Sequence, residues 1–253
     1  MTLKHSKKTM LITGGSRGIG AAVAIIAAQR GYSIAVNYAS NEKAAAQVVE
    51  QIKNFGADAF AIQGNVAVES DILRMFEAID ARWSRLDALI NNAGIVAVKA
   101  RVDEMSAERL QTMFTTNVIG SFLCAKEAIK RMSKRYQGSG GVIVNLSSAA
   151  ARLGSPAEYV DYASSKGAID TMTIGLSKEL AAEGIRVNAV RPGLIDTDIH
   201  ASGGQPDRVE RFVSMIPMQR GGTAEEVANT VMWLVSDEAS YVTGALIDVG
   251  GGR

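Results

Sequence analysis

The chain has 253 residues, of which 47% are hydrophobic and 21% are charged, a balance that excludes a disordered polymer and predicts a substantial core. With 27 basic and 26 acidic residues the formal net charge is +1, so no global field favours nucleic acid or an anionic membrane as a partner. The longest apolar run, residues 21–28, is far below the roughly 20 residues that cross a bilayer. We expect one soluble domain over residues 1–253 that acts on a small molecule.

Short β-rich runs alternate with longer stretches of helical periodicity along the chain. This alternation predicts an α/β fold with a doubly wound parallel sheet of about seven strands and helices on both faces. The expected strands are residues 10–13, 33–36, 59–63, 88–91, 142–146, 186–190 and 245–249. The expected helices are residues 18–30, 41–55, 69–84, 107–135, 158–183 and 223–235.

The first expected strand runs directly into the sequence TGGSRGIG and then into a helix. Glycine permits a tight turn and a close approach of backbone to a pyrophosphate, and the N-terminus of the helix attracts the negative charge. The spacing differs from the commoner G-x-G-x-x-G, but its position between strand and helix predicts a dinucleotide site. The expected contacts in this turn are Gly14, Ser16, Arg17, Gly18, Ile19 and Gly20.

The end of the second strand bears on the choice of dinucleotide. Many NAD-binding units carry an acidic residue there for the ribose hydroxyls, but residues 35–41 contain no carboxylate. Because Arg17 lies in the glycine turn, a 2′-phosphate would be accepted, which predicts NADP(H) over NAD(H). The expected contacts at this end are Arg17, Asn37, Tyr38 and Ser40.

Tyr162 and Lys166 are four residues apart in an expected helix, so both side chains lie on one face. An ammonium close to a phenol stabilises the phenolate and lowers a pKa that is otherwise about 10. Tyr162 would then serve as an acid or base near neutral pH. Ser147 and Ser148 end the fifth expected strand and place a hydroxyl at the carboxyl edge of the sheet.

Residues 193–222 interrupt the alternation of strands and helices, because they contain two glycine pairs and two prolines without periodicity. The segment follows a strand, on the side where doubly wound sheets bind ligands, and we interpret it as a mobile substrate lid. An ordinary long surface loop is the alternative. The lid and the loop 149–158 should shape the substrate pocket, but their small residues do not specify a substrate.

These motifs, taken in order, resemble the short-chain dehydrogenase/reductase family, whose members have a Rossmann-type fold, over essentially the whole chain. The turn TGGSRGIG at residues 13–20 looks like the cofactor turn of the family, and NNAG at 91–94 looks like its strand-four motif. The sequence YASSK at 162–166 is similar to its Tyr-x-x-x-Lys signature, and RPGLIDT at 191–197 to its Pro-Gly segment. The resemblance points to the ketoacyl-reductase-like or glucose-dehydrogenase-like branch.

The resemblance implies a role for each catalytic residue. Tyr162 would donate a proton to the carbonyl oxygen, and Ser148 would orient that oxygen. Ser148 precedes Tyr162 by 14 residues, one more than in many members of the family, so Ser147 is the alternative. Lys166 would lower the pKa of Tyr162 and bond the nicotinamide ribose, while Asn117 would hold a water in a proton relay.

The resemblance also implies cofactor contacts outside the glycine turn. Asn65 occupies the place of a family aspartate that holds the adenine amino group, and its amide still supplies an acceptor oxygen. The implied contacts are Asn65, Val66, Asn91, Ala93, Gly94, Tyr162, Lys166, Pro192, Gly193, Ile195 and Thr197. No metal site is expected, because neither of the two histidines, His5 and His200, has a second ligand at a suitable spacing.

Assembly and location follow from weaker signals. The resemblance implies a homotetramer with interfaces on the helix that starts at residue 107, the Tyr162 helix and residues 244–253. The single cysteine, Cys124, cannot form an internal disulfide and is expected to pack in the core of a cytoplasmic protein. A basic cluster could meet an acidic carrier protein, although a solvated helix face is the simpler interpretation. The cluster is Lys130, Arg131, Lys134 and Arg135.

Together these patterns predict an NADP(H)-dependent oxidoreductase that moves hydride between the nicotinamide and a carbonyl or secondary alcohol, with Tyr162 as general acid/base and no metal. One alternative is an NAD-dependent sugar or polyol dehydrogenase. Another, from a different class, is a non-catalytic regulatory protein that senses the cofactor. The complete set of four catalytic candidates, Asn117, Ser148, Tyr162 and Lys166, argues against that second alternative.

Overall fold

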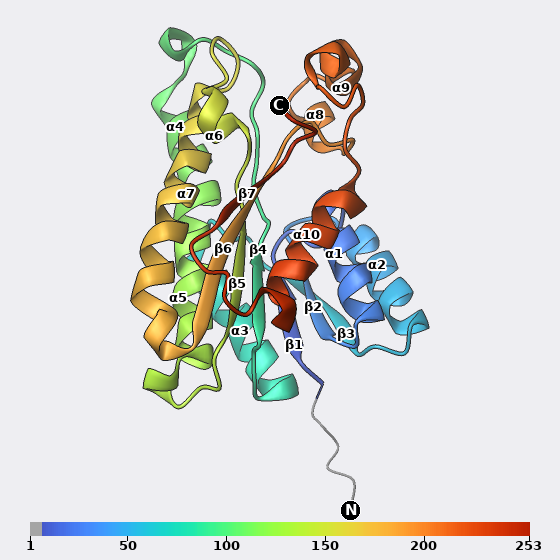
Figure 1. Ribbon diagram of the computed structural model, residues 1–253, viewed down its shortest axis with the longest axis vertical. Coiled ribbons are helices and arrows are strands. Elements are labelled where there is room, and N and C mark those ends of the chain that lie inside the picture. Colours follow the sequence, from blue (N-terminus) through green and yellow to red (C-terminus); the bar gives the residue numbers. More distant parts are fainter. Residues whose placement is uncertain (1–6) are drawn as a thin grey trace, which may run out of the picture.

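The computed structural model describes residues 7–253 apart from the side chain of residue 200, so His5 and the His200 side chain lie outside the described part. One seven-stranded parallel sheet runs through the molecule in the order β3-β2-β1-β4-β5-β6-β7 (Figure 1). The strands are β1 (Thr9–Ile12), β2 (Ser33–Tyr38), β3 (Ala59–Gln63), β4 (Ala88–Asn91), β5 (Gly141–Leu146), β6 (Ile185–Pro192) and β7 (Leu246–Val249). The predicted α/β fold is confirmed, and the ends of each strand differ from the prediction by no more than two residues.

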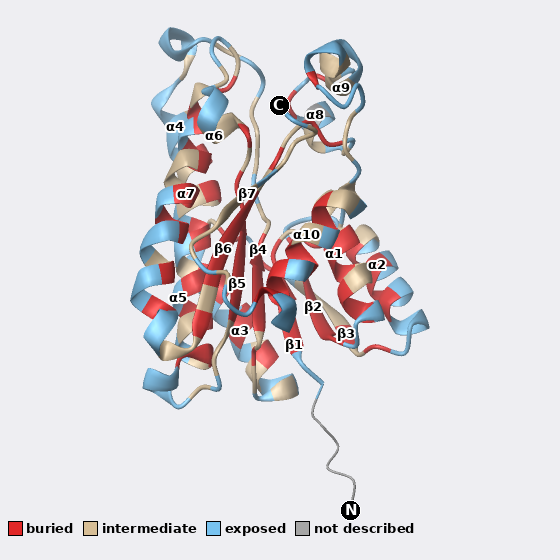
Figure 2. Ribbon diagram, viewed as in Figure 1, coloured by how far each residue is buried: buried red, intermediate tan, exposed pale blue. Residues whose placement is uncertain are grey.

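Helices cover both faces of the sheet because parallel strands must be joined by crossover connections. Buried residues of α1, α2 and α10 pack on one face, and those of α3, α5 and α7 pack on the other. The five inner strands are largely buried, the edge strands β3 and β7 are only partly buried, and the outer sides of the helices are exposed (Figure 2). The α-helices are α1 (Gly18–Gln29), α2 (Glu42–Asn54), α3 (Glu69–Trp83), α4 (Ala107–Phe114), α5 (Gly120–Met132), α6 (Ala150–Leu153), α7 (Val160–Leu180), α8 (Ile199–Ser202), α9 (Arg208–Phe212) and α10 (Ala224–Val235).

The prediction of one continuous helix over residues 107–135 is wrong. A π-helical turn, η2 (Thr115–Ile119), separates α4 from α5. Gly120 packs closely on the loop that follows β3. A Cβ added at Gly120 would lie 2.6 Å from the Val66 carbonyl oxygen. Such π-helical turns are frequent at functional sites, and this one carries Asn117.

Residues 193–222, expected to be a lid, contain the short helices α8 and α9 and lie beside the carboxyl end of the sheet (Figure 1). The segment is tied to the body through Tyr159, whose hydroxyl donates to the Gly203 carbonyl oxygen over 3.2 Å. At its base, Ile195 and Gly222 form a parallel bridge. The segment is therefore folded and docked against the start of α7.

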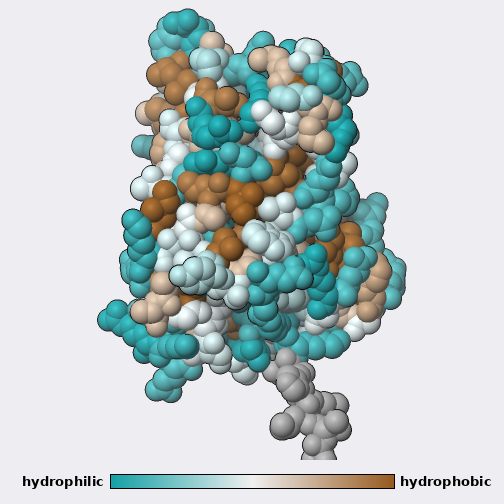
Figure 3. Space-filling view, viewed as in Figure 1, coloured by the Kyte–Doolittle hydropathy of each residue, from teal (hydrophilic) through white to brown (hydrophobic). Residues whose placement is uncertain are grey.

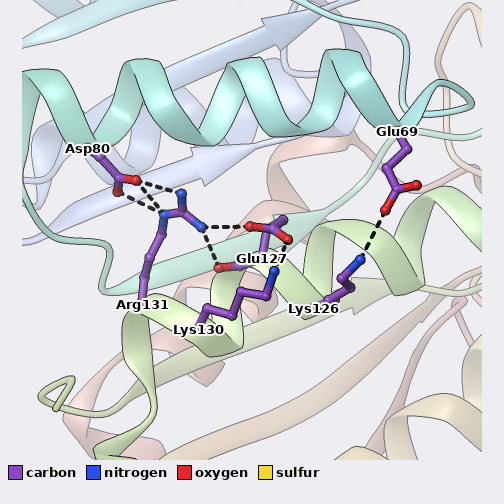
Figure 4. A network of polar contacts seen from close by, with 6 residues as sticks. All are labelled: Glu69, Asp80, Lys126, Glu127, Lys130 and Arg131. Carbon is purple, nitrogen blue, oxygen red and sulfur yellow. Dashed lines mark hydrogen bonds and ion pairs between the residues drawn. The ribbon is translucent and has the colours of Figure 1, made fainter. Parts of the chain in front are cut away.

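An ion network joins α3 to α5 (Figure 4). The Arg131 guanidinium contacts Asp80, with Nε 2.8 Å from Oδ1, and Glu127, with Nη1 3.0 Å from Oε2. Lys130 Nζ lies 2.6 Å from the same Glu127 carboxylate. Burial raises the pKa of Glu127, but its two cationic neighbours outweigh this and hold it below its usual value. Two of the four basic residues considered for a carrier protein are therefore already paired.

Two further observations concern location and redox chemistry. Within residues 7–253, no helix has both the length and the apolar character needed to span a membrane. Cys124 is buried in the core, where burial raises the pKa of its thiol to about 12. Its thiolate is therefore scarce at neutral pH, as expected for a packing residue.

Candidate active site

A cavity of about 170 Å³ opens at the carboxyl end of the sheet. Ile19 after the glycine turn lines one side, Ser148 and Tyr162 line another, and Thr197 comes from the segment that follows β6. The strand order reverses between β1 and β4, and in open parallel sheets ligands bind at such a switch point. The cavity is therefore where a dinucleotide and a substrate would meet.

The glycine turn has the geometry of a phosphate cradle. Gly14 and Gly18 have φ angles of +61° and +53°, a region that side-chain-bearing residues rarely adopt. An added Cβ at Gly14 would lie 3.0 Å from the Ala93 Cα, and one at Gly20 would lie 2.5 Å from the Gly14 carbonyl oxygen. No side chain caps the start of α1 at Arg17, so the helix N-terminus is open to an anion.

Two residues that sequence reasoning missed hold this turn in place. Asn92 Nδ2 donates to the carbonyl oxygens of Thr13 and Gly14, each over 2.9 Å. The Thr13 hydroxyl accepts from the backbone N–H groups of Asn92 and Ala93, each over 3.0 Å. Asn92 directly follows the predicted contact Asn91, and side chains alternate sides along extended chain. This alternation could have identified Asn92 from the sequence, because only one of two adjacent asparagines can face the glycine turn.

The structure divides the residues expected at the 2′-phosphate into two groups. Asn37 is buried, with Oδ1 accepting from Gly14 N over 3.0 Å and Nδ2 donating to the Gly64 carbonyl oxygen over 2.9 Å. Its side chain supports the turn, so a direct contact with a 2′-phosphate finds no support in this geometry. Arg17 and Ser40 are exposed, and the Arg17 side chain has no hydrogen bond or ion pair with any described residue.

Two other expected cofactor side chains also bond within the protein. Asn65 Oδ1 accepts from Ala67 N over 3.0 Å, and Asn91 Nδ2 donates to Asn145 Oδ1 over 3.0 Å. These contacts fix the loop after β3 and join β4 to β5. Their direct roles toward a dinucleotide stay predictions.

Tyr162, Lys166 and Ser148 meet in the cavity as predicted. The Lys166 Nζ lies 5.6 Å from the centroid of the Tyr162 ring and donates to the Leu146 carbonyl oxygen over 2.7 Å. The Ser148 hydroxyl is hydrogen-bonded to the Tyr162 hydroxyl. Ser147, by contrast, is buried and donates to the Lys166 carbonyl oxygen over 3.2 Å. The geometry therefore favours Ser148 over Ser147 as the hydroxyl that acts with Tyr162.

The pKa shifts of Tyr162 and Lys166 differ from the expectation. Burial raises the pKa of the Tyr162 phenol, and the hydrogen bond from Ser148 lowers it by a smaller amount. Burial lowers the pKa of Lys166 to about 8, opposed by the nearby Asp170 carboxylate. The expected lowering of the Tyr162 pKa by Lys166 is therefore not what dominates, because burial disfavours the charged form of both groups.

Asn117 is brought to the same place by the π-helical turn. Its Oδ1 accepts from Ile95 N over 2.8 Å, and its Nδ2 donates to the Ile95 carbonyl oxygen over 3.0 Å. The same nitrogen donates to Ser165 on α7 over 3.1 Å. A Cβ added at Gly94 would lie 3.3 Å from Asn117 Oδ1 and 3.5 Å from Lys166 Nζ, so glycine keeps this space open. The Asn117 side chain ties the loop after β4 to α7, and its expected water ligand stays a prediction.

The predicted residues at the end of β6 and after it line the same cavity. Pro192, Gly193 and Ile195 line it, and the Thr197 methyl group lies 3.5 Å from where a Cβ at Gly18 would stand. The segment after β6 and the glycine turn are thus adjacent.

Three further residues at the cavity, of which only Arg208 belongs to the lid, were not identified from the sequence. Tyr159, Arg208 and Arg253 all line the cavity, and the Arg208 guanidinium lies 5.0 Å from the centroid of the Tyr159 ring. Ser155 and Ala157 before α7 have φ angles of +45° and +59°, which are strained for residues other than glycine. No local signal in the sequence marks these two positions. Among the described residues no cluster of three or more His, Cys, Asp or Glu could hold a metal ion.

A parallel sheet with a glycine turn at its switch point, and a Tyr, Lys and Ser in the adjoining cavity, define the class of dinucleotide-dependent oxidoreductases. Residues 14–253 match the family model described as enoyl-(acyl carrier protein) reductase. The chain belongs to the short-chain dehydrogenase/reductase family, so the predicted family is confirmed, and as an oxidoreductase it acts on a small-molecule substrate.

Similar proteins cover the whole chain. An uncharacterized oxidoreductase of Escherichia coli, YgfF, is 58% identical over 96% of this chain and 98% of its own length. The 3-oxoacyl-(acyl-carrier-protein) reductase FabG of Staphylococcus aureus is 38% identical over 97% of both chains. Glucose 1-dehydrogenase 2 of Bacillus subtilis is also 38% identical, over 97% of this chain and 94% of its own. The predicted ketoacyl-reductase-like or glucose-dehydrogenase-like branch is thus confirmed.

Solved structures agree with the fold. The angucycline C-6 ketoreductase LanV with bound NADP superposes with a TM-score of 0.89 at 34% identity, covering 97% of this chain and 95% of that chain. A blue fluorescent protein from a metagenomic library in complex with NADPH gives 0.88 at 33% identity, covering 97% of both chains.

Proposed function

We propose that this protein is an NADP(H)-dependent oxidoreductase that interconverts a carbonyl and a secondary alcohol, with Tyr162 as its general acid/base. The observation that carries the proposal is the meeting of Tyr162, Ser148 and Lys166 in one cavity beside the glycine turn. A regulatory protein that only senses the cofactor would have no need of this arrangement.

The residues present suit a dinucleotide that carries a 2′-phosphate on its ribose. The positive φ angles at Gly14 and Gly18 and the open start of α1 suit its pyrophosphate. The space at Gly94, next to the Lys166 ammonium, suits a ribose. Arg17 is exposed and unpaired near a strand end without a carboxylate, which favours a 2′-phosphate. When bound, this cofactor supplies or accepts the hydride.

Each catalytic side chain has a defined task in carbonyl reduction. Tyr162 donates its hydroxyl proton to the carbonyl oxygen as the carbonyl carbon receives the hydride, giving an alcohol. Ser148, hydrogen-bonded to Tyr162, holds that oxygen in line. The raised pKa of Tyr162 keeps its proton on at neutral pH, as an acid requires. In the reverse direction the alcohol proton returns to Tyr162.

The test is NADPH oxidation over a panel of ketones, aldehydes, quinones and 3-oxoacyl thioesters, with Tyr162→Phe assayed alongside. We expect the variant to lose a factor of about 10² to 10⁴ in kcat, the usual contribution of general acid catalysis. Tyr136→Phe, at an exposed tyrosine outside the cavity, is the matched control. Equal rates for wild type and Tyr162→Phe would reject the catalytic assignment and favour a binding role.

Two matched serine variants test the assignment of Ser148 as the hydroxyl that orients the substrate oxygen. Ser148→Ala should lower kcat, whereas Ser147→Ala should alter stability more than rate, because its hydroxyl bonds the α7 backbone. The reverse pattern would make Ser147 the orienting residue.

A second candidate function is favoured by the similarity to a glucose 1-dehydrogenase. An enzyme of this type would oxidise a sugar or polyol with NAD⁺. Oxidation of glucose faster than reduction of any carbonyl in the panel, with NAD⁺ preferred to NADP⁺, would support it.

We further propose a single catalytic domain with residues 193–222 as its substrate lid, a homotetramer and a cytoplasmic location.

A further inference from the structure

Two arginines from outside the catalytic segment reach the cavity that holds Tyr162. Arg208 begins α9, and Arg253 follows the turn after β7. Although 45 positions separate them in the sequence (253 − 208), the end of the chain lies beside α8 and α9 (Figure 1). Both line the same cavity as Tyr162 and Ser148. The active site therefore has a cationic end that the proposed reaction does not require.

Arg208 is held rigidly but is not fully satisfied. Its Nη2 lies 2.6 Å from Glu158 Oε2, and its guanidinium lies 5.0 and 5.1 Å from the ring centroids of Tyr159 and Phe212. The side chain is only 12% exposed. Its Nη1 is buried and has no hydrogen-bond partner. A buried donor without a partner is unfavourable, so this N–H group calls for an acceptor.

Arg253 adds a second positive charge. Its guanidinium lies 5.8 Å from the Phe212 ring centroid and has no ion pair with any described residue. Burial and the charge of Arg208 lower the pKa of Arg253, and Glu158 raises it, which shows that the three groups interact. Glu158 is therefore ion-paired with Arg208 and acts on Arg253 only from beyond ion-pair distance.

The neighbouring charges do not neutralise this excess. Arg152 pairs with Asp248 at 3.4 Å, and Arg211 pairs with Asp207 at 3.1 Å, so each of these pairs is neutral. Among the side chains next to the cavity, Arg208 and Arg253 are cationic and Glu158 is anionic, while Arg152 also donates to the main-chain oxygen of Arg253 over 3.2 Å.

We propose that Arg208 and Arg253 bind a carboxylate of the substrate, so that the enzyme reduces an oxoacid or oxidises the corresponding hydroxy acid. This inference rests on the proposed function, because it places the carbonyl at Tyr162 and Ser148. A guanidinium presents parallel N–H donors that match the two oxygens of a carboxylate. Leu153 and Ile199 are apolar members of the same lining and suit the carbon chain between the two ends.

The test compares oxoacids with their methyl esters, which keep the carbon skeleton and remove the charge. We expect wild type to favour the acid by about 10-fold or more in kcat/KM, the usual discrimination of a charged hydrogen bond. Arg208→Gln and Arg253→Gln should reduce this preference toward unity, with the ester rate and the KM for NADPH unchanged. Arg253→Gln breaks no ion pair and so keeps the test valid if Arg208→Gln misfolds. Arg211→Gln on the same helix, outside the cavity lining, is the matched control.

Several outcomes would overturn the inference while leaving the proposed function intact. These are equal turnover of acid and ester by wild type, an acid preference that both arginine variants keep, and a rise in the KM for NADPH instead. Faster turnover of a phosphorylated ketone than of any oxoacid would show that the oxyanion is a phosphate. Calorimetric binding of the acid to Tyr162→Phe separates the two proposals. Binding that depends on Arg208 and Arg253 supports the carboxylate site even where turnover is absent, and failure of the acid to bind rejects it.

Discussion

At the residue scale, Lys166 should set the alkaline limit of activity. Burial lowers its pKa to about 8, so the ammonium beside Tyr162 is lost as the pH rises through that value. We expect kcat/KM for carbonyl reduction to fall above about pH 8. Asp170 raises the pKa of Lys166, so Asp170→Asn should move the fall to lower pH. Asp248→Asn is the control, because Asp248 also contacts Arg191 but does not act on Lys166. Identical pH profiles for wild type and Asp170→Asn would contradict this prediction.

Arg17 carries the prediction about the cofactor. Arg17→Gln removes the exposed cation proposed to meet the 2′-phosphate, and NADH has no such group. A charged hydrogen bond contributes about 1.5–3 kcal/mol, so the KM for NADPH should rise about 10-fold or more while that for NADH stays constant. Arg30→Gln, just beyond the other end of α1, serves as the control. A rise shared equally by both cofactors would indicate a general effect on the turn.

At the element scale, a buried ion pair fixes the start of α7 to α4. Arg109 Nε lies 2.8 Å from Asp161 Oδ2, and the Asp161 side chain is fully buried directly before Tyr162. Arg109→Met would leave this carboxylate buried and unpaired, and the free energy of unfolding should fall by about 3–5 kcal/mol. Denaturant titration measures this loss.

An exposed pair and a double variant complete that test. Arg101 and Asp103 form an ion pair in which both side chains are about two-thirds exposed, so Arg101→Gln should change stability by less than about 1 kcal/mol. Adding Asp161→Asn to Arg109→Met should restore part of the loss. If Arg109→Met costs no more than Arg101→Gln, the buried pair does not hold the two helices together.

At the scale of the whole molecule, apolar surface remains where the family resemblance places subunit contacts. Ile119 and Phe122 at the start of α5 are 49% and 47% exposed. On the face that carries β7 and α10, hydrophobic side chains gather across the middle (Figure 3). We expect a tetramer by light scattering, and Phe122→Asp should yield smaller species because it places a charge in the interface. Lys43→Glu on α2 is the control, and a monomeric wild type would reject the prediction.

The sequence was sufficient to predict a feature wherever that feature depends on the conformation of a few neighbouring residues. The Gly14 and Gly18 positions were predicted because only glycine adopts their φ angles readily, and the four-residue spacing of Tyr162 and Lys166 places both on one helix face. Buried parallel strands give apolar runs, so the sheet could also be predicted. The prediction of one helix over residues 107–135 was wrong because a π-helical turn at Thr115–Ile119 interrupts the helical period, just before the close approach of Gly120 to the Val66 backbone.

The sequence by itself determined the fold class, the glycine turn and the catalytic candidates, because each depends on residues close together in the chain. Only the tertiary structure decided which polar side chains face the cavity. In the folded chain, Asn37 and Ser147 are buried, and Asn92 rather than Asn91 bonds the glycine turn. Arg208 and Arg253, which are distant in sequence, line the same cavity. Local spacing cannot specify such choices, because burial and charge at each position are determined by elements that are distant in sequence.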